Sequence, residues 1–326
     1  MKIKNALELR HLKLCYKINA KKHNPPKVVT KKYILKYTGK ACRTVPSLTR
    51  EIGSFIESGK PMMMARLGNT EGRIAGQYCE KLVGLRKKYD KEWMNWLFTT
   101  SGFFADDMDR EEAADRYAKM TLDGLKECDF LSAMFPQKVY MPYLFHHYCP
   151  DTQPTFSDMG PYYDNIPTDE TWIKYLGGKK VLAINSFAES IQMQYPAKRK
   201  LIANSPEYEL PEFELKTYKT LCTQLDERPM GFKNFFEALE FMLGEIKQID
   251  FDIALVGCGA YGFPMSVEIK KWGKQVFEIC SATPKLFGIY DNRDVTQGAK
   301  YLNENWIRPI ESKPKNYKQV ENGCYW

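Results

Sequence analysis

Histidine is scarce in this chain and cysteine is scattered, which limits the metal chemistry that the sequence offers. The four histidines are His11, His23, His146 and His147, and no metal-ligand spacing joins them to a cysteine. The nine cysteines include no C-x-x-C pair and do not form the framework of a small secreted protein. We therefore expect reduced thiols in a cytosolic protein and no zinc site.

Long apolar runs are also missing. Nothing in the sequence approaches the roughly 18 apolar residues of a membrane span, and the N-terminus has no continuous apolar signal core. The expected localisation is cytoplasmic, with peripheral contact at the inner face of the plasma membrane as an addition. No known nucleic-acid-binding module accompanies the positive charge, so nucleic acid is not an expected partner.

Positive charge is present throughout the chain and is concentrated near its beginning. The 326 residues include 48 Lys and Arg and 40 Asp and Glu, which leaves a net charge of +8 and favours anionic partners. Residues 1–50 form a basic arm in which Leu9, Leu12 and Tyr16 recur at helical spacing. Such a helix either lies on an anionic bilayer or packs on its own domain, and the sequence leaves both open.

A strand, a glycine turn, a helix and a second strand follow one another near residue 260. Ile253–Val256 is a short β-branched apolar run, Pro264–Trp272 has the spacing of a helix, and Gln275–Ile279 is the second strand. Between the first strand and the helix lies a G-x-G-x-x-G sequence. A unit of this kind binds anions, because the helix N-terminus presents free N–H groups and the positive end of its dipole.

The glycines of this turn, Gly257, Gly259 and Gly262, allow the backbone to approach a phosphate. The expected ligand is therefore a nucleotide or another phosphorylated molecule. In the alternative interpretation the same glycines serve packing only. Glu278 lies near the offset at which dinucleotide enzymes place an acid for the ribose, which keeps a dehydrogenase or methyltransferase open.

A second glycine turn follows the predicted strand Met62–Ala65. It carries Arg66 and Glu71 in the sequence R-L-G-N-T-E, and a rigid strand aims such loop residues into a site. Arg66 has the planar fork that binds phosphate oxygens. The alternative is a buried pair of Arg66 with Glu71 that only holds the turn.

The predicted fold is α/β, a Rossmann-like, doubly wound and mainly parallel sheet with flanking helices. A further strand at Val181–Ile184 precedes a helix from Glu189 to Tyr195 that we expect Pro196 to stop, and Phe232–Gln248 reads as an amphipathic helix. The expected parts are the arm (1–50), an N-terminal α/β part (51–165) and a Rossmann-like nucleotide-binding part with an aromatic tail (166–326).

With these motifs placed, the chain resembles bacterial glycosyltransferases of the GT-D type, found in capsule and surface-polysaccharide clusters. The shared motif is R-x-G-x-x-E, formed here by Arg66, Gly68 and Glu71. Further matches cover nearly everything after the arm: GGKKV at 177–181, Phe187 with Ile191, Gln194 and Tyr195, 232–240, DFDIALVGCGAYGFP at 250–264, LFGI at 286–289, NWIRP at 305–309 and VENGCYW at 320–326.

The resemblance implies a GT-D-like fold and a cytosolic enzyme that transfers a sugar from a nucleotide-sugar donor to an acceptor, usually a lipid-linked saccharide. It implies Glu71 and Arg66 as catalytic residues, with Glu71 acting either as general base or as ligand to Mn²⁺ or Mg²⁺ on the diphosphate. The expected nucleotide-sugar-binding residues are Gly68, Asn69, Thr70, Phe187, Gly257, Gly259, Tyr261, Gly262, Arg293 and Arg308.

The sequence departs from the family pattern at several positions. Asn69 stands where relatives often place the aspartate of a metal-binding D-x-E, so a metal ion is left open. The other departures are Asn185-Ser186-Phe187 for His-Pro-Phe, 159–163 for Leu-Glu-Pro-Tyr-Tyr, Cys280 to Pro284 for a Gly-Gly segment, and Asp294 for Trp. Two alternatives remain: a dinucleotide- or S-adenosylmethionine-dependent enzyme that uses Glu278, and a non-catalytic nucleotide-sugar-binding protein.

Overall fold

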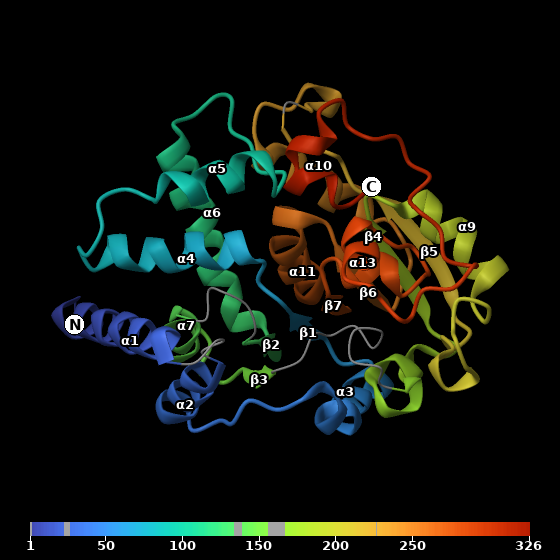
Figure 1. Cartoon of the computed structure of the whole chain (residues 1–326), viewed down its shortest axis with the longest axis horizontal. Coiled ribbons are helices and arrows are strands. Elements are labelled where there is room, and N and C mark those ends of the chain that lie inside the picture. The colour runs from blue at the N-terminus through green and yellow to red at the C-terminus, as the bar shows by residue number, and fades with distance from the viewer. Residues whose placement is uncertain (1, 23–26, 134–138, 156–166, 226) are drawn as a thin grey trace.

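The computed structural model describes residues 2–22, 27–133, 139–155, 167–225 and 227–326 (Figure 1). Its seven strands form one sheet in the order β3-β2-β1-β7-β6-β4-β5, and every pairing is parallel. The strands are β1 (Met62–Ala65), β2 (Phe130–Ser132), β3 (Gln153–Thr155), β4 (Lys180–Asn185), β5 (Glu214–Lys219), β6 (Ile253–Gly257) and β7 (Gln275–Glu278). The predicted parallel α/β fold is confirmed.

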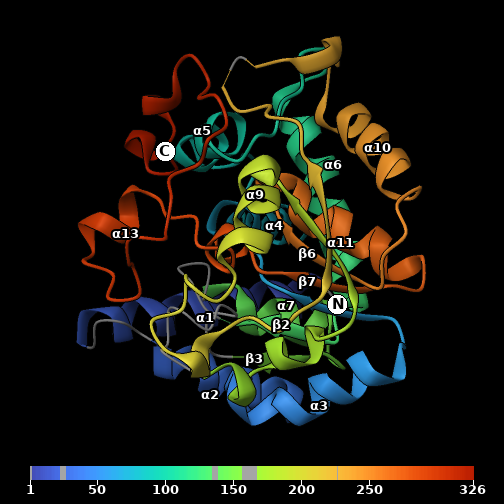
Figure 2. The same ribbon diagram turned by 90° about the vertical axis from the view of Figure 1, so that its right-hand side faces the viewer.

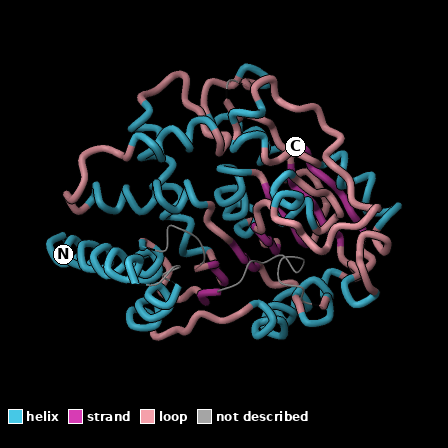
Figure 3. Tube along the Cα trace, in the orientation of Figure 1, coloured by secondary structure: helices cyan, strands magenta, loops and turns pink. Residues whose placement is uncertain are grey.

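Helices surround this sheet, as the tube in Figure 3 shows. They are α1 (Lys2–Lys22), α2 (Lys27–Thr38), α3 (Val45–Ser58), α4 (Asn69–Leu82), α5 (Lys91–Thr99), α6 (Arg110–Gly124), α7 (Met141–Tyr148), α9 (Ala188–Lys198), α10 (Phe235–Ile246), α11 (Gly262–Lys271), α12 (Ala282–Lys285) and α13 (Asn292–Thr296). Within the described ranges, none is long and apolar enough to cross a membrane.

Alternate residues of each central strand face opposite cores. In β1, Met63 lies in the core that contains residues of α4, α6, α10 and α11, whereas Met62 and Met64 lie in the core that contains residues of α3, α9 and α12. Figure 2 shows α10 and α11 on one side of the molecule and α13 with the C-terminal segment on the other. Because both faces are covered, the central strands β1, β6 and β7 are buried on both sides, as in other parallel sheets.

The boundaries of several elements differ from the sequence prediction for identifiable reasons. Pro196 does not stop its helix; it lies inside the last turns of α9. The helix predicted from Phe232 begins at Phe235 as α10, because the Asn234 side chain caps it by accepting from the Glu237 N–H (3.0 Å). The predicted part boundary at 165 lies within 156–166, outside the described residues, and His23 lies outside them as well.

The basic arm is helical, as predicted, and it packs on the domain. Leu9 and Leu12 of α1 are buried in the core that α4 and α7 help to form. The Lys13 ammonium adds an ion pair of 2.5 Å with Glu80 of α4. Figure 1 shows α1 lying at one end of the molecule beside α7.

Candidate active site

A cavity of about 290 Å³ lies at the carboxyl edge of the sheet. Segments that follow five strands meet there, as expected where parallel strands end together. The residues that line it are 66, 68–71, 96, 100–102, 185–187, 220–224, 257–259, 261, 263, 278, 280, 281, 284, 289–291, 293, 321, 325 and 326. The lining therefore combines segments from most of the chain.

Ten of the twelve residues expected at the site line this one cavity. They are Arg66, Gly68, Asn69, Thr70, Glu71, Phe187, Gly257, Gly259, Tyr261 and Arg293. Gly262 and Arg308 lie outside the lining. Gly262 begins α11 against Glu278, and the Arg308 guanidinium stacks 5.0 Å from the ring centre of Tyr290, which does line the cavity.

The segment after β1 is a helix start and not an extended turn. Gly68 is the N-cap of α4, so Asn69, Thr70 and Glu71 already belong to the first helical turn. The Glu71 side chain folds back over Gly68, and a Cβ at position 68 would lie 2.0 Å from Oε2 of Glu71. Because glycine has no Cβ, it leaves room at position 68 for the carboxyl group of Glu71.

Glu71 is a buried carboxyl group in a mixed electrostatic environment. Burial raises its pKa, and nearby Glu321 adds to this effect. Its own backbone N–H, Ser101 and the charge of Arg66 favour the ionised form and act in the opposite direction. A carboxyl group whose pKa is raised toward neutral pH is suited to general base work.

Glu278 is the second buried carboxyl group at the cavity. It accepts a hydrogen bond from the Arg66 backbone N–H (3.0 Å) and one from the Cys280 thiol (2.9 Å). Burial raises the pKa of Glu278 to about 7. Only 2% of the residue is exposed, and both carboxyl oxygens accept hydrogen bonds from protein groups. This geometry does not favour a hydrogen bond from Glu278 to a ribose.

The glycine turn after β6 is packed tightly against other parts of the protein. A Cβ on Gly257 would lie 2.2 Å from the carbonyl oxygen of Cys280, and one on Gly259 would lie 2.6 Å from that of Ser101. Gly259 also has a φ of 59°, in the left-handed region that favours glycine. The Ala260 N–H donates to the Ser101 carbonyl (2.8 Å). These contacts support the packing interpretation of the glycines, although Gly257 and Gly259 still line the cavity.

The residues that depart from the family pattern have local structural roles. The Asn69 Oδ1 accepts from the Arg73 Nε (3.1 Å), and the Asn185 Oδ1 accepts from the Phe187 N–H (2.9 Å). Asp294 completes the capping box of α13 and pairs with the buried Lys285. Cys280 has a φ of 51°, where glycine is unstrained. The departing segment 159–163 lies outside the described residues.

The C-terminal segment closes one side of the cavity. Trp326 meets Phe187 edge to face with ring centres 6.3 Å apart, and its carbonyl group accepts from Asn292 Nδ2 (2.6 Å). Arg293 lies 4.6 Å from the Tyr325 ring centre and donates to Asp291 (2.7 Å). The sequence indicated an aromatic tail, but its position at the site was not predicted.

Sequence reasoning also missed the loop after α5. Ser101 bonds to Glu71, and Thr223 donates to the Gly102 carbonyl (2.6 Å) while its hydroxyl lies 2.8 Å from the Tyr261 hydroxyl. Ser101, Gly102 and Thr223 belong to no motif. The only signal in the sequence was a short Ser-Gly break between two helical patterns, and folding brings it to the glycine turn.

The donor set of the cavity does not favour Mg²⁺ or Mn²⁺ held by the protein alone. Such ions take oxygen ligands, and the Asn69 oxygen is already bonded to Arg73. Glu278 is bonded to Arg66 and Cys280. Among the described residues, no group of three metal-binding side chains lies at this cavity. We therefore derive no step through a metal ion.

No family model matches the chain, and no curated protein matches it. One solved structure similar to it, a selenomethionine-substituted domain of unknown function 1792, shares 12% identity with a TM-score of 0.45 and covers 89% of this chain and 97% of its own. Another similar structure is described as the highly conserved domain of unknown function 1792, which has a distinct glycosyltransferase fold. It shares 12% identity with a TM-score of 0.46, and the match covers 90% of this chain and 94% of that structure's chain. Likeness at this level supports no statement about activity.

Proposed function

We propose that this protein is a glycosyltransferase that moves a sugar from a nucleotide-sugar donor to a saccharide acceptor. The observation that carries the proposal is the joint position of Arg66 and Glu71, which are buried where β1 ends and line one cavity with Arg293. The resemblance of the R-x-G-x-x-E motif points the same way. It also favours a lipid-linked acceptor and a role in bacterial surface-polysaccharide synthesis.

The reaction needs the leaving diphosphate to be stabilised, the acceptor hydroxyl to be deprotonated and water to be excluded. The bond from the sugar C1 to the diphosphate oxygen breaks, and its electron pair leaves with the nucleoside diphosphate. Arg66 and Arg293 offset the charge that develops there. The acceptor hydroxyl oxygen bonds to C1 and passes its proton to Glu71 as general base. The cavity wall contributed by Phe187, Tyr325 and Trp326 excludes water from the oxocarbenium-like centre.

The first test is ligand binding by the purified full chain. A ligand that binds only the folded state raises the unfolding temperature, so UDP-, GDP-, CDP- and dTDP-sugars are compared with NAD and S-adenosylmethionine. We expect a shift with one nucleotide-sugar. A shift with NAD or S-adenosylmethionine alone would overturn the proposal and return the argument to Glu278.

The second test separates catalysis from binding. Glu71→Gln keeps the size of the side chain and removes the base, so we expect nucleotide-sugar binding to persist while transfer falls by about 10²–10⁴-fold. The matched control is Glu268→Gln, which removes a carboxylate on α11 that pairs with Lys271 on the surface. Full transfer by Glu71→Gln would support a protein that binds nucleotide-sugar without using this carboxylate.

We further propose that α1 rests on an anionic membrane, where a lipid-linked acceptor resides. Ile3, Leu7, Leu14 and Ile18 are exposed by 79%, 59%, 57% and 47%. Their spacing places them within about 60° of one another on a helix of 3.6 residues per turn. They therefore form an apolar stripe, opposite the face that buries Leu9 and Leu12.

Positive charge borders the apolar stripe on both sides. Arg10 and Lys17 follow it on one side and Lys4 lies on the other, and all three are exposed. This combination fits a helix lying in the headgroup region of an anionic bilayer. The pattern matches the first of the two interpretations that the sequence leaves open, while the buried leucines show that α1 also packs on its domain.

Vesicle binding tests this part of the proposal. We expect the full chain to sediment with vesicles containing phosphatidylserine and not with pure phosphatidylcholine. Leu7→Ser with Leu14→Ser should abolish the binding. The control changes two exposed apolar residues elsewhere, Leu201→Ser with Val295→Ser. Equal binding by the two double variants would contradict a membrane role of the stripe.

A further inference from the structure

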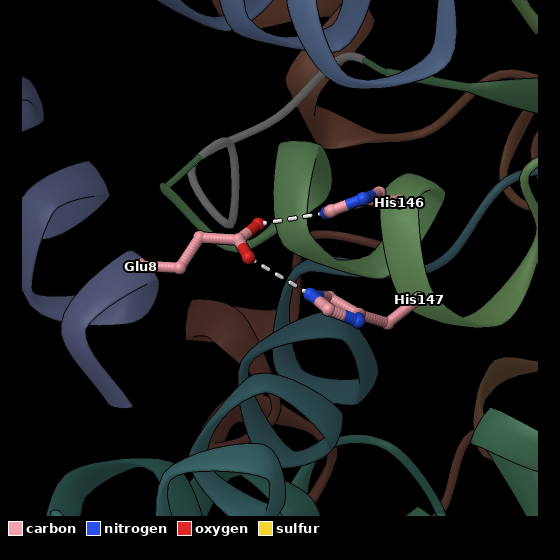
Figure 4. Close-up of side chains that lie close together, drawn as sticks. All are labelled: Glu8, His146 and His147. Atoms are coloured by element: carbon pink, nitrogen blue, oxygen red, sulfur yellow. Dashed lines mark hydrogen bonds and ion pairs between the residues drawn. The ribbon is translucent and has the colours of Figure 1, made fainter. Parts of the chain in front are cut away.

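A carboxylate and two imidazoles converge between the arm and the domain. Glu8 of α1 faces His146 and His147 in the last turn of α7 (Figure 4). The Glu8 Oε1 lies 3.0 Å from the His146 Nδ1, and the Glu8 Oε2 lies 3.0 Å from the His147 Nε2. The three residues each offer one ligand atom, and these atoms lie within 4.8 Å of one another.

We propose that this cluster binds a divalent transition-metal ion of the Zn²⁺ class. Two imidazole nitrogens and a carboxylate oxygen are a donor set that zinc uses, with a fourth position left for water. Ligand atoms about 2.0–2.1 Å from a tetrahedral ion lie about 3.3 Å from one another. The two separations of 3.0 Å involve different oxygens of the Glu8 carboxylate, and one ligand atom from each residue lies within 4.8 Å of the other two. Rotation of the side chains toward a common centre would bring these atoms to the spacing of a bound ion.

The side chains are held in this arrangement by their neighbours. The Tyr37 ring stacks on His146 at 5.1 Å between ring centres and 10° between planes, and the Tyr143 ring lies 4.2 Å from that of His147. On the other side, the burial of Leu9 and Leu12 and the Lys13–Glu80 ion pair fix α1. The ligands are therefore pre-positioned, which lowers the entropic cost of binding.

The exposure of the three side chains fits a site that an ion can enter. Glu8 is 10% exposed, whereas His146 and His147 are 36% and 23% exposed. The carboxylate is thus largely shielded from water, and the imidazoles leave an opening for the ion and a water ligand. None of the three residues lines the cavity of the candidate active site.

The position of the cluster indicates a structural role. Glu8 and His146 are separated by 138 positions in the chain, so the ion would cross-link the arm to the domain. It would hold α1, and with it the apolar stripe, in a fixed orientation on α7. The expectation of no zinc site rested on the spacing of histidine and cysteine, and that spacing carries no information on a carboxylate 138 positions away.

The test uses the metal-stripped full chain and zinc alone. Titration calorimetry should show one tight site per chain. The double variant His146→Gln with His147→Gln should lose it, whereas His11→Gln, which changes an exposed histidine of α1, should retain it. Unfolding curves recorded in chelator check that the variants fold, because the site is then empty in every protein.

Two further readouts separate this cluster from the nine free thiols, which can also bind zinc. Zinc X-ray absorption should give only nitrogen and oxygen ligands at about 2.0–2.1 Å, without sulfur at about 2.3 Å. Zinc should also slow the release of α1 by trypsin in the wild type and not in the double variant. Absence of binding, a sulfur shell, or full binding by the folded double variant would overturn the proposal.

Discussion

The carboxyl group of Glu278 accepts a hydrogen bond of 3.0 Å from the backbone N–H of Arg66. The bond joins the end of β7 to the first residue after β1, its neighbour in the sheet. It fixes the start of the segment that carries Glu71, and it occupies the acid that a dinucleotide enzyme would use for a ribose. One buried contact therefore shapes the site and weighs against one of the alternative functions.

The raised pKa of Glu278 predicts a specific dependence of stability on pH. Its pKa is about 7 in the folded protein and 4.5 for the ordinary group. Between these values the folded state binds more protons than the unfolded state, so the free energy of unfolding falls as pH rises and is constant above pH 7. The loss amounts to about 2–4 kcal/mol.

Glu278→Gln removes this titration, so its advantage over the wild type should grow from pH 5 to pH 8. Urea unfolding of both proteins at the two pH values measures the difference, with Glu268→Gln as the surface control. Parallel changes in the wild type and the variant would show that Glu278 ionises normally.

The close packing of the glycine turn predicts that Gly259→Ala is destabilising without any ligand. The new Cβ would lie 2.6 Å from the Ser101 carbonyl oxygen, at a φ of 59°. We expect a loss of about 2–4 kcal/mol in the free energy of unfolding. The matched control is Gly244→Ala in α10, where a Cβ meets nothing within 4 Å, and a gain of about 0.5–1 kcal/mol is expected. A wild-type unfolding curve for Gly259→Ala would contradict this packing.

The raised pKa of Glu71 predicts the shape of the pH–rate profile. A general base must be ionised, so kcat/KM should rise with pH along a limb that lies above the range of an ordinary glutamate. Glu71→Gln should lose that limb together with the rate. Initial rates measured across pH 4 to 8 with the identified donor test this point, and an acid limb unchanged in the variant would assign it to another group.

The buried Lys285 beside the cavity predicts a large effect on stability. It is 2% exposed and pairs with Asp294 and, at 3.2 Å, with Asp291. Lys285→Met leaves the buried Asp294 carboxylate without its cation, while Asp291 keeps its pair with Arg293, so we expect a loss of about 3–5 kcal/mol in the free energy of unfolding. Lys180→Met, which removes an exposed pair with Asp250, should leave the urea midpoint nearly unchanged. Equal urea midpoints for the two variants would show that the buried ion pair adds nothing to the stability of the protein.

Local pattern was sufficient wherever a segment buries apolar residues in a regular period. The predicted bounds of β1, Met62–Ala65, agree with the structure. The two edge strands, β3 and β5, were not predicted. β3 is three residues long and contains Pro154. β5 is polar and half-buried, because it lies at the edge of the sheet and pairs with β4 alone.

The candidate site was predictable only in part. The motifs after β1 and β6 were found because a glycine turn at the end of a predicted strand is typical of a site, whereas Arg293 was assigned only through the family resemblance. Ser101 and Thr223 belong to no pattern, and they reach the cavity through contacts between distant segments. The glycines indicated that another group lies close to the backbone, but the sequence does not show whether that group is a phosphate or the carbonyl oxygen of Ser101.

The sequence by itself determined the parallel α/β class, the helical arm and the two glycine turns, because periodicity and backbone freedom are local properties. The tertiary structure alone decided what each turn faces, which acids are buried and which side chains share a space. Glu8 beside His146 and His147 is the plainest case. Contacts across 138 positions depend on how whole elements pack, and no local pattern encodes that choice.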